Sequence, residues 1–230
     1  MPLRIGFDMD GVLADFAAAY HQVESRLFGP AADGDVDPPE REEARQAGTA
    51  KPSPDGARDL RRRRDAIWQV IESTPDFWTT LAPLEPGAVR RIHELMLKYR
   101  WEVFFLTQRP ATEGDTVQRQ TQRWLVAQGF DLPSVLVIGG ARGAAAGALR
   151  LDYHVDDSAQ HCLDMIADSN ARPLLVARGS NEAAIASARK LGIGVTAGIG
   201  QALEILERAT LVQTNPNLLQ KLATLVGWSR

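Results

Sequence analysis

Short apolar segments alternate with helical segments along most of this chain of 230 residues. The apolar segments are rich in β-forming residues, whereas the segments between them repeat their apolar side chains with the period of an amphipathic helix. Strands that alternate with helices are joined by right-handed crossovers, which produce a parallel sheet covered by helices on both faces. The sequence therefore predicts an α/β fold. The predicted strands are 3–7, 102–107, 134–140, 151–157, 173–178 and 193–198.

Polar side chains stand at the carboxyl ends of three of these predicted strands. In parallel α/β sheets the ligand binds outside that edge, so these side chains are expected to meet at one site. Two of them, Asp8 and Asp10, would project from the same side of an extended backbone, with α-carbons about 6.5–7 Å apart. The full set is Asp8, Asp10, Thr107, Asp156 and Asp157.

Carboxylates gathered in this way favour a bound cation. Two nearby carboxylates repel each other, and burial makes either of them harder to ionise. A divalent cation relieves both costs, and Mg²⁺ prefers a few carboxylates, several waters and a substrate phosphate as its ligands. We therefore expect Asp8 and Asp10 to bind Mg²⁺ together with Asp156 and Asp157.

Composition narrows the classes of partner. The net charge of −3 gives no general attraction to nucleic acids or acidic membranes. No run of about 18 apolar residues predicts a membrane span, and the apolar stretch after Met1 is too short for a signal peptide. The only cysteine, Cys162, excludes an internal disulfide and a cysteine-based zinc cluster. We expect a cytoplasmic protein with neither a polymeric nucleic acid nor a membrane as partner.

Three motifs, in order along residues 4–158, resemble the haloacid dehalogenase (HAD) superfamily of phosphohydrolases. "DMDGV" (8–12) is similar to its first signature, an Asp-x-Asp after the first strand. "FFLT" (104–107) is similar to the second, a hydrophobic strand ending in Thr or Ser, and "HVDDS" (154–158) to the fourth, an acidic pair after a strand. The resemblance implies a Rossmann-like three-layer α/β/α parallel sheet, with a small helical cap inserted after the first strand.

The resemblance also implies a role for each of these residues. Asp8 would be the nucleophile that forms an aspartyl-phosphate. Asp10 would protonate the leaving alcohol and then activate water, while its main-chain carbonyl binds Mg²⁺. Thr107 would bind a phosphoryl oxygen. Asp156 would ligate the metal directly, with Asp157 beside it or acting through water.

The third signature of this superfamily is usually a lysine, and here the chain departs from the pattern. No lysine lies between Lys98 and Lys190. Arg142 lies in the matching stretch, and arginine is a suitable phosphate-binding residue. Arg150 is the alternative, although its position at the entry of the last signature strand suits a structural role. We favour Arg142.

About 90 residues separate the first and second signatures, where a direct crossover would need only a dozen or more. In this superfamily an insert at that place is a cap over the active site. We expect a core domain formed by 1–15 and 84–230, and a helical cap at 16–83. Within the cap, 30–58 is rich in proline, glycine and charge, which predicts a flexible loop. From residue 59 a helix is expected to run to about 73.

The second aspartate bears on the reaction. Dehalogenases of this superfamily typically lack it, so Asp10 favours a phosphate ester over a carbon–halogen bond; mutases keep both aspartates. "GFDMDGVLADF" (6–16) and "DFWTTLAPLEPGAVRRIHEL" (76–95) also resemble the 5′(3′)-deoxyribonucleotidase branch. The expected function is a magnesium-dependent phosphatase acting on a nucleoside monophosphate or another small phosphorylated metabolite. A phosphosugar mutase and a non-catalytic phosphate- or partner-binding protein are the alternatives.

Several other residues have a structural interpretation beside a functional one. Asp15 is expected to cap the helix that follows it. The aromatic residues Trp68, Phe77 and Trp78 would form either core or a surface for a flat base, and the arginine run 61–64 a solvated face. A last helix near 215–227 would cover the core or a partner subunit in a homo-oligomer. The histidines, all expected to be structural, are His21, His93, His154 and His161.

Overall fold

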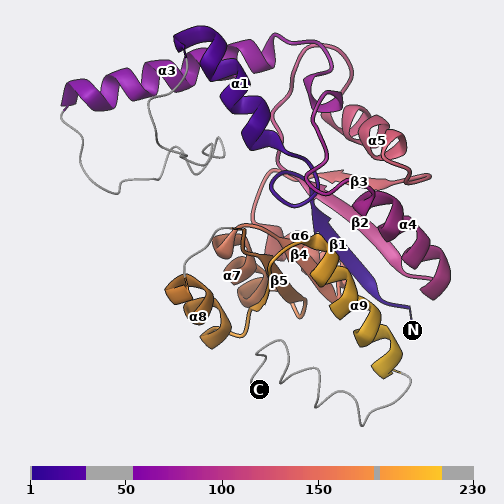
Figure 1. Cartoon of the computed structure of the whole chain (residues 1–230). Helices are drawn as coiled ribbons and strands as arrows, with labels where there is room; N and C mark the ends of the chain where they lie inside the picture. Colours follow the sequence, from indigo (N-terminus) through magenta and orange to yellow (C-terminus); the bar gives the residue numbers. More distant parts are fainter. Residues whose placement is uncertain (1, 30–53, 179–181, 214–230) are drawn as a thin grey trace.

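A computed structural model describes residues 2–29, 54–178 and 182–213 of the chain (Figure 1). Its centre is a sheet of six parallel strands in the order β3-β2-β1-β4-β5-β6. This confirms the predicted Rossmann-like α/β fold. The strands are β1 (Arg4–Asp8), β2 (Glu102–Thr107), β3 (Ser134–Val137), β4 (Tyr153–Asp156), β5 (Arg172–Val176) and β6 (Gly194–Thr196).

Helices cover both faces of this sheet. Alternate side chains of a strand face opposite sides, and Ile5 and Phe7 of β1 lie in the main core with residues of α4, α5 and α9. On the other face, Leu175 of β5 packs with residues of α7 and α8, and α6 packs against α7. The core helices are α4 (Ala88–Tyr99), α5 (Val117–Ala127), α6 (Arg142–Leu149), α7 (Ala159–Asp168), α8 (Glu182–Lys190) and α9 (Ile199–Gln213).

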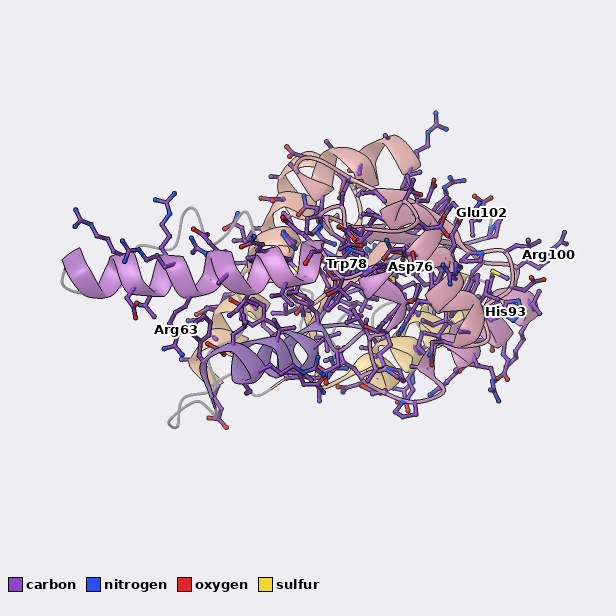
Figure 2. The ribbon with its side chains drawn as sticks, turned by 90° about the horizontal axis from the view of Figure 1, so that it is seen from above. Arg63, Asp76, Trp78, His93, Arg100 and Glu102 are labelled. Atoms are coloured by element: carbon purple, nitrogen blue, oxygen red, sulfur yellow. The ribbon has the colours of Figure 1, made fainter. Side chains whose placement is uncertain are left out.

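Two helices, α1 (Phe16–Phe28) and α3 (Pro54–Glu72), form the inserted unit between β1 and β2. They pack against each other beyond the carboxyl ends of the strands (Figure 1). Asp15 caps α1 as predicted, because its carboxylate accepts a hydrogen bond from the Ala18 amide at 2.9 Å. Figure 2 shows Arg63 between the two helices, where its guanidinium lies 4.6 Å from the centroid of the Phe28 ring.

The start of α3 differs from the prediction. The helix begins at Pro54, so residues 54–58 belong to it and not to the predicted loop. Proline is well tolerated in a first helical turn, where its missing N–H would have no helical partner. In the arginine run 61–64, Arg61 and Arg62 are exposed to solvent, as predicted, whereas Arg63 and Arg64 are half-buried. The remainder of the predicted loop, 30–53, lies outside the described residues.

The aromatic residues of α3 and of the segment that follows it are interior. Trp68, Phe77 and Trp78 are 6%, 5% and 1% exposed, so they form core and not a surface for a flat base. Phe16 lies 5.5 Å from both Trp68 and Trp78 between ring centroids, which joins α1, α3 and the short 3₁₀ helix η1 (Phe77–Thr79). Aromatic pairs at this spacing stabilise a core beyond the area that they bury.

The helix expected near 215–227 lies outside the described residues. Within the described ranges, every helix is too short or too polar to cross a bilayer.

Candidate active site

The first signature strand, β1, and the fourth, β4, are neighbours in the sheet. Phe7 of β1 pairs with Val155 of β4, so Asp8 and Asp156 are the next residues of two adjacent strands. This position is the point where the strand order reverses, since β2 lies on one side of β1 and β4 on the other. Ligand sites of open α/β sheets form there, because the flanking loops separate.

Asp8 is buried, at 1% exposed, and its carboxylate forms an ion pair with Arg142. Arg142 donates a hydrogen bond to its Oδ1 at 2.5 Å. The other oxygen, Oδ2, is also buried and has no hydrogen-bond partner among the described residues. Burial raises the pKa of Asp8 to about 6; the Arg142 charge opposes this shift, whereas Asp156 and Asp10 add to it. An oxygen in this state favours a ligand that brings positive charge or a hydrogen bond.

Asp156 is fully buried but has partners on both oxygens. Its Oδ1 accepts from the Ser158 amide at 2.9 Å and pairs with His161 Nδ1 at 3.2 Å. Its Oδ2 pairs with His154 Nε2 at 3.0 Å and lies 3.4 Å from Arg142 Nη1. Burial by itself would raise the pKa of Asp156, but the Arg142 charge and the histidine hydrogen bonds hold it well below its usual range.

The two histidines that contact Asp156 were expected to be purely structural. His154 lies two residues before Asp156 and therefore on the same face of β4, and His161 lies in the first turn of α7. Partners of this kind orient a metal-ligating carboxylate and fix its direction. The spacing of His154 relative to Asp156 was the available sequence signal; the placement of His161 depends on where α7 begins.

Three carboxylates converge at this edge. Asp8, Asp156 and Asp157 each offer an oxygen, and these three atoms lie within 4.8 Å of one another. Asp157 is exposed, whereas the other two are buried. Oxygen donors of this type suit Mg²⁺, and the unpartnered Oδ2 of Asp8 leaves one donor available for it. The residues present therefore fit a divalent cation.

Gly11 brings the loop after β1 against this triad. Its φ is +76°, in the region that favours glycine, and a β-carbon built there would lie 1.7 Å from Asp157 Oδ2. The loop is also fixed from outside, because Arg178 donates to the Gly11 carbonyl at 2.5 Å and to Glu85 Oε1 at 3.0 Å. Glu85 in turn accepts hydrogen bonds from the amides of residues 199 and 200 at the start of α9.

Asp10 contacts a residue that the motif analysis did not select. Arg109 donates from Nε to Asp10 Oδ2 at 2.8 Å and from Nη2 to Oδ1 at 2.7 Å. The Arg109 side chain is 1% exposed, whereas that of Asp10 is 22% exposed. Asp10 offers no side-chain oxygen to the acidic triad. The signal for Arg109 was its position two residues after Thr107, at the same strand end as the second signature.

The remaining predicted site residues lie at the same edge. Thr107 is buried at the end of β2, and its carbonyl accepts from the Ile138 amide at 2.9 Å. β2 is the other neighbour of β1, with Leu106 paired to Asp8. Arg142 is the first residue of α6, whereas Arg150 is the exposed cap at the opposite end of that helix. Only Arg142 of these two arginines contacts Asp8.

Solved structures share the overall fold of this chain. A HAD family hydrolase from Deinococcus radiodurans R1, which holds phosphate and sodium, superposes with a TM-score of 0.50 at 17% identity, over 92% of this chain and 96% of that one. A phosphonoacetaldehyde hydrolase-like protein from Oleispira antarctica gives a TM-score of 0.54 at 12% identity, over 92% and 93% of the two chains. The protein has the HAD fold.

The likeness to HAD structures lies in the fold. No family model matches the sequence, and no curated protein does. The four stretches that resemble HAD signatures meet at the carboxyl ends of β1, β2 and β4. The deoxyribonucleotidase branch stays a prediction.

Proposed function

We propose that this protein is a metal-dependent phosphomonoester hydrolase that acts through an aspartyl-phosphate on Asp8. The observation that carries the proposal is the state of the Asp8 side chain. One oxygen accepts from Arg142, and the other is buried without a partner beside two further carboxylates. A merely structural aspartate would have both oxygens satisfied, because an unpaired buried acceptor costs about 1–3 kcal/mol.

The chain's own residues divide the chemistry. The Asp8 carboxylate attacks phosphorus and forms an O–P bond, while the bond to the leaving alcohol breaks and Asp10 gives that alcohol a proton. Asp10 then takes a proton from water, which attacks the phosphoryl group, releases phosphate and restores Asp8. Thr107 and Arg142 bind phosphoryl oxygens in this scheme. Positioning and neutralisation of charge supply most of the catalysis in phosphoryl transfer.

Mg²⁺ would be held by Asp8, Asp156 and Asp157, together with the main-chain carbonyl of Asp10. When bound, it would neutralise the charge that gathers on the phosphoryl oxygens. Arg142 would add a fixed positive charge, since a guanidinium stays protonated in proteins. The Arg142 charge and the histidine hydrogen bonds lower the pKa of Asp156 and so keep that ligand ionised in advance of binding.

The proposed substrate is a nucleoside monophosphate or another small phosphorylated metabolite. Support for the nucleotide comes from the likeness of 6–16 and 76–95 to the deoxyribonucleotidase branch. The burial of Trp68 and Trp78 removes them as a surface for the base, so another part of the cap would have to contact it. A phosphosugar mutase would use the same aspartates but would keep the phosphoryl group.

The test measures inorganic phosphate released from p-nitrophenyl phosphate and from a panel of nucleoside monophosphates, sugar phosphates and phospho-acids. Release should require Mg²⁺, stop in EDTA and disappear in Asp8→Asn. Asp131→Asn, the same change at an exposed loop position, is the matched control. Equal activity in Asp8→Asn and in the control would contradict the nucleophile. Low activity on nucleotides alone would contradict only the substrate class, and sugar phosphate isomerisation without phosphate release would indicate the mutase.

A further inference from the structure

Arg109 is a buried cation in contact with three other side chains. Its guanidinium binds Asp10 through two hydrogen bonds, and its Nη1 donates to Thr121 Oγ1 of α5 at 3.1 Å. The ring of Trp78 lies against it, with 4.8 Å between the Arg109 Cζ and the ring centroid. Every nitrogen of the guanidinium therefore has a hydrogen-bond partner.

Trp78 is itself fixed in place. Its indole Nε1 donates to the Pro110 carbonyl at 3.0 Å, and its amide donates to Gln120 Oε1 at 3.1 Å. Both partners lie close to Arg109 along the chain or through a contact. Pro110 is the next residue after Arg109, and Gln120 directly precedes Thr121, which binds Arg109. In Figure 2 Trp78 lies where α3 meets the body of the molecule. A residue of η1 thus packs against the Arg109 guanidinium.

The two members of the Arg109–Asp10 pair differ in exposure. The guanidinium is interior, whereas the carboxylate is partly open to solvent at the edge of the sheet. A two-pronged arginine–carboxylate contact fixes the plane of the carboxylate as well as its position. Each oxygen retains a second lone pair, because the guanidinium uses only one on each. The carboxylate is therefore presented in a fixed direction with acceptor capacity left over.

We propose that Arg109 is a positioning residue that aims the Asp10 carboxylate at the leaving group. The inference rests on the proposed function and deepens it, since Asp10 is there the proton donor to the alcohol. Arg109 acts through Asp10 and contacts neither phosphorus nor the alcohol. The fit of Trp78 and Thr121 around the guanidinium keeps the carboxylate from rotating away. Proton transfer depends steeply on such geometry, because the donor must lie within hydrogen-bond reach of the leaving oxygen.

The reaction itself offers a measurement that separates positioning from general damage. An alkyl phosphate needs a proton on its leaving oxygen, whereas p-nitrophenolate is stable as an anion and needs none. If the Asp10 carboxylate is no longer held in position, hydrolysis of the alkyl ester should therefore slow far more than hydrolysis of p-nitrophenyl phosphate. General acid catalysis contributes about 10²–10⁴-fold, so the two values of kcat/KM should separate by about 10²-fold in Arg109→Gln.

The experiment compares kcat/KM for p-nitrophenyl phosphate and for an alkyl phosphate in the full chain with Mg²⁺. Arg109→Lys keeps the charge and one hydrogen bond and should recover part of the alkyl rate. Thr121→Val leaves the guanidinium intact, removes one of its anchors and should give a smaller effect of the same kind. Arg119→Gln, at an exposed arginine of α5, is the matched control and should change neither rate. Circular dichroism at the assay temperature establishes that each variant is folded.

The outcomes separate the inference from the function on which it rests. If the unmodified protein hydrolyses neither ester, the proposed function fails. If the unmodified protein is active but Arg109→Gln and Arg109→Lys slow both esters by one factor, Arg109 is only structural and the inference is overturned. A selective loss with the alkyl ester, partly recovered by lysine, supports it.

Discussion

Replacement of Asp8 by asparagine should stabilise the metal-free protein at neutral pH, although it removes the proposed nucleophile. Asp8 is buried, and burial is the main cause that raises its pKa from 3.8 to about 6. A raised pKa means that the folded state resists ionisation of this carboxyl more than the unfolded chain does. Asparagine has nearly the same shape and no charge, and its oxygen can still accept from Arg142, which also retains Asp156 at 3.4 Å.

The size of the effect follows from the shift in pKa. Each unit corresponds to about 1.36 kcal/mol, so the shift from 3.8 to about 6 gives a cost of about 3 kcal/mol once Asp8 is ionised. The folded state binds more protons than the unfolded state between these two values, so the contribution of Asp8 to stability falls as the pH rises through them. At about pH 5 the cost is roughly half of its value at about pH 7.5.

The assay is thermal unfolding in EDTA at about pH 5 and pH 7.5. A change of 1 kcal/mol moves the midpoint by about 2–4 °C in a protein of this size. Asp8→Asn should raise the midpoint by several degrees at the higher pH and by clearly less at the lower one, while Asp131→Asn should change neither. A fall in the midpoint at about pH 7.5, or an equal rise at both, would refute the reasoning from buried charge.

Three further predictions concern the surroundings of Asp8. Gly11→Ala should lower activity and the stabilisation by Mg²⁺, because the new methyl group clashes with Asp157. Gly87→Ala is the control: its φ is also positive, at +85°, but a β-carbon there meets nothing within 4 Å. It therefore measures the backbone strain alone, of about 1–2 kcal/mol. Mg²⁺ at a hundred times its Kd should raise the free energy of unfolding by about 2.7 kcal/mol, and Asp157→Asn should reduce that gain in a melting assay. In Glu85, burial raises the pKa, but hydrogen bonds from Arg178 and the α9 amides outweigh it and hold the pKa below 4.5. Its stabilisation is present above that value and is lost as the pH falls through the lowered pKa, so Glu85→Gln should lower the melting midpoint at neutral pH and have a smaller effect in acid.

Local patterns in the sequence were sufficient to predict the helices and strands and most of the polar residues at the carboxyl ends of the strands. The strand 102–107 and the cap at Asp15 agree with the structure because both depend on near neighbours in the chain. The convergence of Asp8 with Asp156 also followed, since parallel strands expose their carboxyl ends on one side. The start of α3 was misplaced because Pro54 reads equally as a loop residue and as a first helical residue.

Contacts between segments far apart in the chain could not be predicted from local sequence patterns. Arg109 and Asp10 are 99 positions apart; the position of Arg109 near Thr107 placed it at this strand end, but no local pattern indicated that it binds Asp10. His161 reaches Asp156 only because Ser158 starts α7 there. The buried position of Trp78 depends on Phe16 and Pro110, which belong to other parts of the chain.

The sequence by itself determined a parallel α/β sheet with acids at the ends of its strands, because the period of apolar side chains and the residue after each strand are local properties. The tertiary structure alone decided which charges pair in the interior. Burial makes an unpaired charge costly, and the two buried arginines of the described residues each pair with a carboxylate that packing brings close: Arg142 with Asp8, and Arg109 with Asp10.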